Sequence, residues 1–464
     1  MSEILKPDSI SGFPEFLPEE QMEFNRLRAI VVRNYELFGF LPLETPEVER
    51  LDVLWAKASE DERKLIYGVD KIVDGRFHRD VPTIAMPFDL TVPLARYVAM
   101  HYGELEFPFR RYQIQRVHRG ERTQSGRSRE FYQADIDVIG NEELSLLHDA
   151  EMPAVIYGIF SEMGLPGFVI RVNNRKIHNG FLQHFGVPFH YETERVDDET
   201  GQRRRVQSST LSIIDDLPKI GSERVEKSFR EEVGLDADVV RQLMEFLAIE
   251  GPVHDLLGRL NTLDYNDVFA AGVAELSQVM KHLTAMGVPQ EACCVDLAIT
   301  RGLNYYTGTV YETTVTNHES MGSVCSGGRY DNLASYYIKK QLPGVGISIG
   351  LTRLFELMRK HGFASVGRKS PTQAVVFNMS PALRANYFEL GTRLRAAEIK
   401  TEVYLEDRKI DRQTKYASKK QIPFGIFMDE ARLAQGVCSV RNYDTGSEEQ
   451  VPLADVCEWL HRHI

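Results

Sequence analysis

The sequence predicts two or three domains, with a β-hairpin and helices in the larger N-terminal part and a smaller α/β domain at the C-terminus. Its 464 residues are too many for one hydrophobic core. An arginine-rich segment at residues 110–129 is flanked by runs that alternate as β-strands do, which indicates a hairpin. After a polar linker at residues 361–371, strand-like and helix-like runs alternate, which is typical of a small α/β domain with a mixed sheet.

The individual elements follow from spacing and from helix-ending residues. Apolar residues at helical spacing between positions 19 and 38 predict one amphipathic helix, which Gly39 ends before an extended segment at 40–46. Another helix is expected to begin at Asp89, with Thr91 as its N-cap. A largely helical pattern runs from about 215 to 286. In the C-terminal part we expect strands at 374–379, 401–405 and 424–428 and helices at 383–397 and 411–420.

Composition narrows the class of protein. Hydrophobic residues make up 43% and charged residues 26%, as in an ordinary globular enzyme, and no apolar run is long enough to cross a bilayer. The N-terminus has no signal-peptide pattern, and the five cysteines form no C-x-x-C pair. We therefore expect a cytoplasmic protein without a metal site. The lack of a bilayer-spanning apolar run makes a membrane an unexpected partner. A net charge of −12 argues against non-specific nucleic-acid binding, so DNA is not an expected partner either.

The segment Arg110–Arg129 carries seven arginines and one acidic residue. A guanidinium group matches phosphate oxygens bidentately, so the segment suggests a hairpin that holds phosphate. A solvated basic edge is the alternative. Side chains two apart on a strand share a face, and after the loop one face carries Arg129, Phe131, Gln133, Asp135 and Asp137. That order suits a ligand with phosphate at one end, a flat ring in the middle and a cationic group beyond.

Several segments resemble the motifs of one enzyme family. R-G-E-R-T-Q-S-G-R-S-R-E-F at 119–131 resembles motif 2 of class II aminoacyl-tRNA synthetases, and F-Y-Q-A-D-I-D-V-I-G at 131–140 resembles its histidyl-tRNA synthetase form. R-G-L-N-Y-Y at 301–306 and S-G-G-R-Y-D-N-L at 326–333 resemble the two histidine signatures of that family. Residues 346–353 resemble motif 3, and the helix and strand ending at Pro46 resemble motif 1. The motifs follow the family's order over nearly the whole chain.

The resemblance implies a domain plan. Residues 1–368 would form a class II-like catalytic domain, an α+β fold built on an antiparallel sheet, with a helical insertion at about 187–286. Residues 371–464 would form the α/β anticodon-binding domain. The motif 1 helix and strand would form the interface of a homodimer. The R-R-R run at 203–205 is either a solvated face or a tRNA contact.

The resemblance also implies an activity, the ATP-dependent ligation of L-histidine to tRNA(His) through a histidyl-adenylate, with Mg²⁺ accompanying ATP. A histidine carboxylate that attacks the α-phosphate is already ionised, so positioning and charge stabilisation would suffice. The main alternative is a catalytically inactive, synthetase-like regulatory subunit that binds histidine. A class II synthetase for another amino acid and a nucleotide-binding module without tRNA are further alternatives.

Position by position, the resemblance assigns Arg119 to the α-phosphate, Glu121 to the adenine end and Arg127 to the outer phosphates. Phe131 and Arg353 would stack on the two faces of adenine. The expected catalytic cations are Arg301 and Arg119. Gln124 would contact the acceptor end of tRNA. For each arginine the alternative is a surface salt bridge, and for Phe131 it is core packing.

For histidine, the resemblance assigns Asp89, Thr91 and Gln133 to the α-ammonium group. Asp137 and Tyr306 would bond the two imidazole nitrogens, and Tyr330 would add to that pocket. Packing is the alternative for both tyrosines. The chain departs from the family pattern at four positions: Asn304, Pro87, Ser128 and Thr352. Of these, Asn304 removes a charge beside the expected imidazole pocket.

Overall fold

A computed structural model describes residues 4–58, 60–74, 76–78, 81–123, 126–196, 203–300, 306–319 and 322–464. The chain divides into two compact units. The first comprises the residues up to Pro14 together with Leu27–Phe363, and the second comprises Glu15–Arg26 and Ala364–Ile464.

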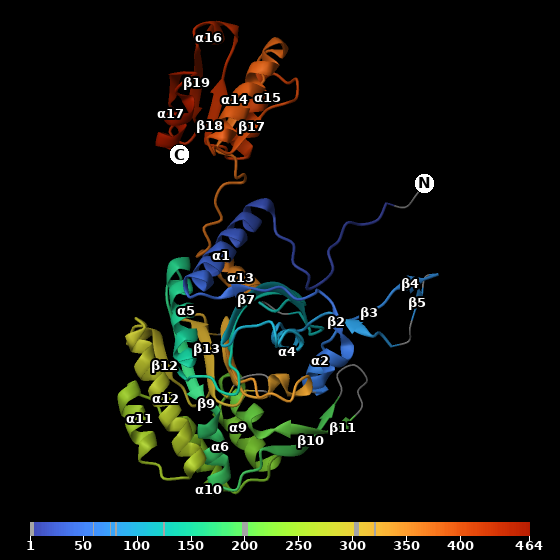
Figure 1. The fold of residues 1–464 in the computed structure, drawn as a ribbon, viewed down its shortest axis with the longest axis vertical. Helices are drawn as coiled ribbons and strands as arrows, with labels where there is room; N and C mark the ends of the chain where they lie inside the picture. The colour runs from blue at the N-terminus through green and yellow to red at the C-terminus, as the bar shows by residue number, and fades with distance from the viewer. Residues whose placement is uncertain are drawn as a thin grey trace. The chain divides into compact units, whose positions relative to one another are not determined.

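An eight-stranded sheet forms the centre of the first unit (Figure 1). Its strands are, in spatial order, β1 (Leu41–Pro42), β7 (Phe109–His118), β8 (Glu130–Ile139), β15 (Gly344–Gly350), β14 (Cys325–Tyr330), β13 (Thr309–Val315), β9 (Phe168–Asn174) and β12 (Cys293–Val295). All neighbours from β7 to β9 are antiparallel, and only the edge strands β1 and β12 pair in parallel. The antiparallel α+β domain expected from the sequence is therefore confirmed.

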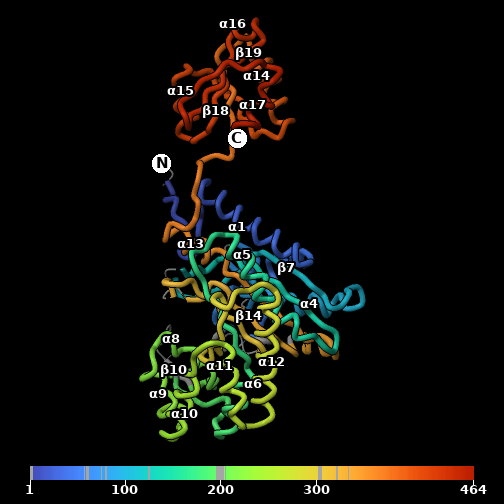
Figure 2. The backbone as a smooth tube through the Cα atoms, turned by 90° about the vertical axis from the view of Figure 1, so that its left-hand side faces the viewer, coloured from blue at the N-terminus to red at the C-terminus, as the bar shows by residue number. Residues whose placement is uncertain are grey.

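Helices bury the apolar side chains of this sheet. The first predicted helix is α1 (Pro18–Leu37), whose buried Tyr35 donates a hydrogen bond of 2.9 Å to the carbonyl of Ala134 on β8. Helices α5 (Leu147–Met163) and α13 (Leu351–Lys360) also pack on the sheet. Helix α12 (Asp267–Ala285) lies beside α5 and α6 (Arg175–His184), as Figures 1 and 2 show. Gly272 permits the approach of α12 to α6, because a Cβ there would lie 2.7 Å from the Ile177 nitrogen.

Helix α4 (Thr91–Met100) begins where the sequence predicts a helix, but Thr91 is not its N-cap. Thr91 is the first helical residue, and the Asp89 carboxylate accepts the hydrogen bond from the Val92 amide at 3.2 Å. Asp and Thr are both good capping residues, so sequence alone did not decide between them. Helix α2 (Leu51–Lys57) packs against α4, beside a small sheet of β2 (Glu49–Arg50), β6 (Ile84–Ala85) and β3 (Gly68–Val69).

The region expected as a helical insertion begins with strands. Residues His190–Val196 (β10) and Arg203–Ser209 (β11) form an antiparallel pair. Helices follow: α7 (Thr210–Asp215), α8 (Leu217–Ile220), α9 (Ser222–Glu231), α10 (Ala237–Leu247), α11 (Val253–Asn261) and α12. The helical pattern predicted from 215 to 286 is thus present, and Figure 2 shows α8 to α11 clustered together. Arg203 on β11 is 78% exposed, as a solvated face requires.

The second unit contains a five-stranded mixed sheet. Its order is β17 (Thr401–Val403), β16 (Ala374–Val376), β18 (Phe424–Phe427), β19 (Val437–Asn442) and β20 (Glu448–Pro452), with parallel pairing around β16 and antiparallel pairing beyond β18. Helices α14 (Arg384–Ala396), α15 (Ile410–Lys419), α16 (Glu430–Ala434) and α17 (Val456–His463) complete the unit. The predicted mixed α/β domain is confirmed. No helix among the described residues has the length and apolar character that crossing a membrane requires.

Candidate active site

The polar face predicted for β8 lines two adjoining cavities. Phe131 and Gln133 line the larger, and Asp135 and Asp137 line the smaller. Both cavities are also lined by Ser326 and Ser348, so they lie next to each other. The strand parity read from the sequence is correct over this stretch, because side chains at a spacing of two project to one face of the sheet.

The larger cavity, here called the outer cavity, has a volume of about 280 Å³. It is lined by Arg119, Glu121, Gly126, Arg127, Ser128, Phe131, Gln133, Ser323, Val324, Cys325, Ser326, Ser348, Gly350, Thr352, Arg353 and Glu356. The structure therefore brings together all five residues that the motifs associate with ATP, from the β7–β8 hairpin and from the N-terminal turn of α13.

The cations of the outer cavity are held by neighbouring groups. The Arg119 guanidinium lies 5.2 Å from the centre of the Phe131 ring, and its Nε donates to the Phe88 carbonyl at 3.0 Å. The Arg127 Nη1 lies 3.5 Å from a Glu121 carboxylate oxygen, and its side chain is 48% exposed. These contacts orient the two guanidinium groups while Arg127 keeps access to solvent and to an anionic ligand.

Only two of the seven arginines in the segment line this cavity, so the phosphate-binding interpretation does not extend to the others. Arg110 forms an ion pair of 2.9 Å with Glu151 and lies over the Phe40 ring. Arg111 is fully buried. Strand alternation turns Arg110 to the opposite face of the sheet, whereas Arg111 lies on the site face and pairs with Asp137, which lines the smaller cavity.

The smaller cavity, here called the inner pocket, has a volume of about 20 Å³. It is lined by Thr91, Asp135, Asp137, Tyr306, Ser326, Tyr330, Gly346, Ile347 and Ser348. The Asp137 carboxylate accepts a hydrogen bond of 2.8 Å from the Tyr330 hydroxyl and lies 2.6 Å from the Arg111 guanidinium. Burial raises the pKa of Asp137, and Arg111 and Tyr330 oppose that rise by stabilising the carboxylate.

Two buried acceptor atoms of residues assigned to the α-ammonium group have no hydrogen-bond partner among the described residues: Asp89 Oδ2 and Gln133 Oε1. Gln133 lines the outer cavity, whereas Asp89 is not among the residues that line either cavity. The Gln133 Nε2 donates to the Ser348 hydroxyl at 2.7 Å, so the Gln133 Oε1 remains available to accept a hydrogen bond from a ligand. Burial raises the pKa of Asp89 to about 7. Buried acceptors are normally paired, so these two atoms indicate a missing donor such as an ammonium group.

The sequence interpretation missed several residues of the site. Arg111 sits opposite Asp137 in the β7–β8 register, so extending the shared face two residues before Gln113 would have found it. Asp135 was predicted on the polar face of β8 but received no role; it accepts a hydrogen bond from the Ser348 hydroxyl, and burial raises its pKa to about 7. Glu356, on α13, lines the outer cavity and was visible only through its helical spacing from Arg353.

Some predicted residues lie outside the described part of the chain. These are Arg301, Gln124 and Asn304. Ser128 and Thr352, two of the departures from the family pattern, line the outer cavity, and the Thr352 hydroxyl accepts a hydrogen bond from the Tyr132 amide at 2.8 Å. The carbonyl of Pro87 accepts one from the His118 amide at 2.9 Å.

An antiparallel sheet with an arginine-lined cavity between a strand hairpin and a following helix is the architecture of a class II aminoacyl-tRNA synthetase catalytic domain. Comparison with known proteins agrees. The Histidyl-tRNA synthetase family matches residues 12–354, and the Anticodon binding domain family matches residues 373–463. The chain belongs to the histidyl-tRNA synthetase family.

Similar proteins match over their whole length. A histidine–tRNA ligase from Clostridium tetani is 43% identical over 98% of both chains, and one from Stenotrophomonas maltophilia is 45% identical over 95% of this chain and 94% of the relative. The crystal structure of histidyl-tRNA synthetase from Nostoc sp. PCC 7120 superposes with a TM-score of 0.85 at 39% identity. It covers 99% of this chain and 100% of that one. The family resemblance noted in the sequence is therefore confirmed.

Proposed function

We propose that this protein ligates L-histidine to tRNA(His) in two steps, with ATP as the co-substrate and a histidyl-adenylate as the intermediate. The observation that carries the histidine part is the pair of orphan buried acceptors, Asp89 Oδ2 and Gln133 Oε1. Both belong to residues that the family motifs assign to an α-ammonium group. Full-length similarity to histidine–tRNA ligases supports the same activity.

In the first step the histidine carboxylate attacks the α-phosphate of ATP, and pyrophosphate leaves. The nucleophile is already ionised, so the protein's task is to orient the reactants and to stabilise charge on the phosphate. Arg119 and Arg301 are the proposed cations at the α-phosphate, and Arg127 binds the outer phosphates. Adenine stacks between Phe131 and Arg353, with Glu121 at its polar edge.

Histidine occupies the inner pocket in this proposal. Asp89, Thr91 and Gln133 receive the α-ammonium group, which supplies the donors that the two orphan acceptors lack. Asp137 accepts from one imidazole nitrogen and the Tyr306 hydroxyl bonds the other, with Tyr330 fixing the Asp137 carboxylate. An apolar isostere of histidine would leave these polar groups unpaired, so the pocket should reject it by roughly 10⁴-fold or more.

Magnesium is the ion expected to accompany ATP. Among the described residues no group of three or more histidine, cysteine or acidic side chains could hold a metal on its own. Mg²⁺ commonly keeps several waters and takes one or two carboxylates together with substrate phosphates. Glu356, the acid of the outer cavity that has no adenine role, fits that pattern. When bound, the ion would neutralise phosphate charge.

The second step transfers histidine from the adenylate to the terminal ribose of tRNA. Residues 1–368, including the insertion at 187–286, act as the catalytic domain in this proposal, and 371–464 bind the anticodon, as the match to an anticodon-binding family supports. Gln124 contacts the acceptor end. The active form is a cytoplasmic homodimer held by the motif 1 helix and strand, which sedimentation at micromolar concentration tests.

The alternative, a histidine-binding regulatory subunit without ligase activity, is less well supported. The chain carries an anticodon-binding module and matches ligases along their whole length. The outer cavity also contains Arg119, Arg127 and Arg353, which an inactive subunit has no need to present together.

Amino-acid-dependent exchange of pyrophosphate into ATP tests the proposal. We expect exchange with histidine and not with the other nineteen amino acids, followed by charging of tRNA(His) with labelled histidine. Silence with every amino acid, combined with measurable histidine binding, would favour the regulatory subunit. Exchange with a different amino acid would reject the pocket assignment.

A further inference from the structure

Backbone carbonyls on both sides of residues 301–305 are held by one short segment, the β9–α6 junction at Asn173–His178. This segment carries no family motif and was not predicted as functional. Two hydrogen bonds hold carbonyls before residue 301: Asn173 Nδ2 bonds Ile299 O at 3.0 Å, and His178 Nε2 bonds Leu297 O at 2.7 Å. Two more hold carbonyls after residue 305, and both come from Arg175. Its Nη1 donates to Tyr306 O at 3.1 Å, and its backbone amide donates to Gly308 O at 2.9 Å. The junction therefore fixes the chain just before the first histidine signature and at its last residue, Tyr306.

Arg175 is the unusual member of this junction. Its residue is only 7% exposed, and no carboxylate among the described residues lies within ion-pair distance of its guanidinium. Its Nε has no hydrogen-bond partner there, and burial lowers its pKa. The Asp215 carboxylate opposes this lowering without forming an ion pair with Arg175. Burying a charge without a direct ion pair is unfavourable for folding, so an apolar side chain of similar size would be expected to stabilise the fold.

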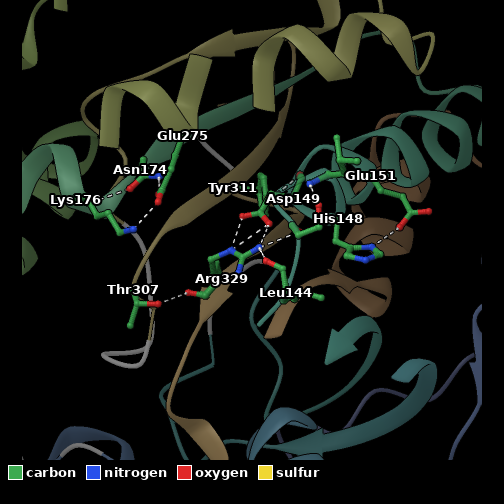
Figure 3. Close-up of polar contacts among 12 residues, drawn as sticks. Leu144, His148, Asp149, Glu151, Asn174, Lys176, Glu275, Thr307, Tyr311 and Arg329 are labelled. Atoms are coloured by element: carbon green, nitrogen blue, oxygen red, sulfur yellow. Dashed lines mark hydrogen bonds and ion pairs between the residues drawn. The ribbon is translucent and has the colours of Figure 1, made fainter. Parts of the chain in front are cut away.

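The neighbouring arginine shows the contrasting arrangement. Arg329, on β14, accepts a hydrogen bond from the Thr307 amide at its carbonyl, at 2.8 Å. Its guanidinium is fully compensated, by an ion pair of 2.6 Å with buried Asp149 and by the carbonyls of Leu144 and Ser145 (Figure 3). Arg329 thus forms an ordinary structural ion pair, whereas the described residues provide no ion pair for Arg175, whose guanidinium donates to the Tyr306 carbonyl.

Tyr306 itself has little freedom on its other side. A Cβ on Gly328 would lie 2.9 Å from a Tyr306 ring carbon, so the ring packs directly on the β14 backbone. Its side chain lines the inner pocket together with Asp137. The carbonyl bond from Arg175 and the packing on Gly328 together define where the phenol can point.

We propose that Arg175 is a positioning residue for histidine recognition, which holds the Tyr306 backbone so that its phenol meets the imidazole opposite Asp137. The inference rests on the proposed function, since it assigns Tyr306 to the imidazole. It adds a residue outside the motifs quoted from the sequence, whose buried charge favours histidine binding and disfavours folding.

Replacement of Arg175 by methionine tests this, because methionine fills a similar volume without the charge or the donor. We expect the histidine KM to rise about tenfold, the effect of losing one charge-assisted hydrogen bond. The ATP KM should change less than twofold, and the unfolding temperature should stay constant or rise. Arg175→Lys, which retains a charged donor, should recover part of the histidine affinity.

Lys176→Met is the matched control. Lys176 is the next residue of α6 and forms an ion pair with Glu275 on α12 (Figure 3). It should leave the histidine KM unchanged. If Arg175→Met lowers the unfolding temperature and weakens both substrates equally, Arg175 is merely structural and the proposal is wrong. An unchanged histidine KM would reject it as well.

Calorimetric titration of histidine into the same proteins separates this proposal from the ligase assignment. If the wild type shows no exchange but binds histidine, a tenfold weaker affinity of Arg175→Met still supports positioning. If the wild type binds no histidine at all, both the function and the role of Arg175 are rejected.

Discussion

The outer cavity and the inner pocket lie on one face of the same sheet, yet they satisfy their polar groups differently. The outer cavity has about 280 Å³ of space, and Arg127 there remains 48% exposed. The inner pocket has about 20 Å³, and its Asp137 is already bonded to Arg111 and Tyr330. The outer cavity therefore has space for a nucleotide before the nucleotide binds. The inner pocket is nearly filled by side chains that are hydrogen-bonded to one another.

The contrast suggests how affinity and selectivity are divided. Exposed cations attract phosphate through long-range charge and tolerate variation in the ligand. A buried network discriminates instead, because a wrong ligand leaves its members unpaired in a medium of low dielectric constant. The outer end should therefore mainly control the rate of adenylation, and the inner end the choice of amino acid.

The largest effect is expected from Arg301, one of the two cations proposed at the α-phosphate. Arg301→Ala should lower the rate of adenylate formation by roughly 10²–10³-fold, the scale of one preorganised charge-stabilising group. Histidine binding should weaken much less. Single-turnover measurement of adenylate formation checks this, and a near-normal rate would contradict the assigned role.

A change at the inner end should affect binding and stability together. Asp137→Asn leaves the Arg111 guanidinium buried without its counterion, which costs about 3–5 kcal/mol of unfolding free energy. It also removes an imidazole partner, so the histidine KM should rise while the ATP KM stays near its normal value. Urea unfolding and exchange kinetics measure the two effects.

A double variant separates these two contributions. Arg111→Met combined with Asp137→Leu removes both charges and should regain much of the stability, because an apolar pair can replace a buried ion pair. It should not regain histidine-dependent exchange. Recovery of both stability and histidine-dependent exchange would show that Asp137 only pairs with Arg111 and does not bind the imidazole.

Histidine binding should also release protons from buried carboxyl groups around the amino-acid site. Burial raises the pKa of Asp89 and of Asp135 to about 7, so each carboxyl is partly protonated at neutral pH. An incoming ammonium group favours the ionised form, so histidine binding at pH 7 should release up to roughly half a proton per carboxyl. Calorimetry in buffers of different ionisation enthalpy measures this release. Asp135→Asn should reduce it, and binding without release would contradict the assignment.

The same two carboxyls give the pH dependence of folding a definite sign. Their pKa values are raised on folding, so between about pH 4 and pH 7 the native state binds more protons than the unfolded chain. Their contribution to stability therefore decreases as the pH rises through this window and is constant above it. Urea unfolding of Asp135→Asn should show a weaker decrease than the wild type.

The smallest effect is expected for stacking in the outer cavity. Phe131→Leu should raise the ATP KM roughly two- to tenfold, because aromatic contacts contribute about 0.5–1.5 kcal/mol beyond area burial. The histidine KM should not change. Tyr132→Leu is the control, since Tyr132 lies on the opposite face of β8, next to Arg116 and Arg28. An equal change of the ATP KM in both variants would remove Phe131 from the adenine site.

Local periodicity explains what the sequence could predict. Strand parity correctly assigned Phe131, Gln133 and Asp137 to one face, because a period of two is a property of the extended backbone itself. Helix α1 and the mixed sheet of the second unit were predicted from similarly local signals. The charge-rich strands β10 and β11 were not predicted, because surface strands without an apolar face lack a clear alternation of apolar and polar residues.

The partner of a charged side chain and its degree of burial depend on residues far away in the chain, so the sequence alone could not predict them. Arg110 and Arg111 look alike in the chain, but only the β7–β8 register places Arg111 against Asp137. The orphan acceptor of Asp89 depends on packing by segments far away in sequence. Arg175 is the extreme example, because a lone arginine beside a lysine predicts an exposed basic surface and is instead buried.

A crystal structure with histidine and a non-hydrolysable ATP analogue tests the central claim, that one sheet face binds the nucleotide at its outer end and histidine at its inner end. We predict adenine between Phe131 and Arg353, the ammonium group at Asp89 and Gln133, and the imidazole within hydrogen-bond distance of Asp137 and Tyr306. An imidazole bound elsewhere, with the Arg111–Asp137–Tyr330 network undisturbed and the inner pocket still closed, would contradict the account.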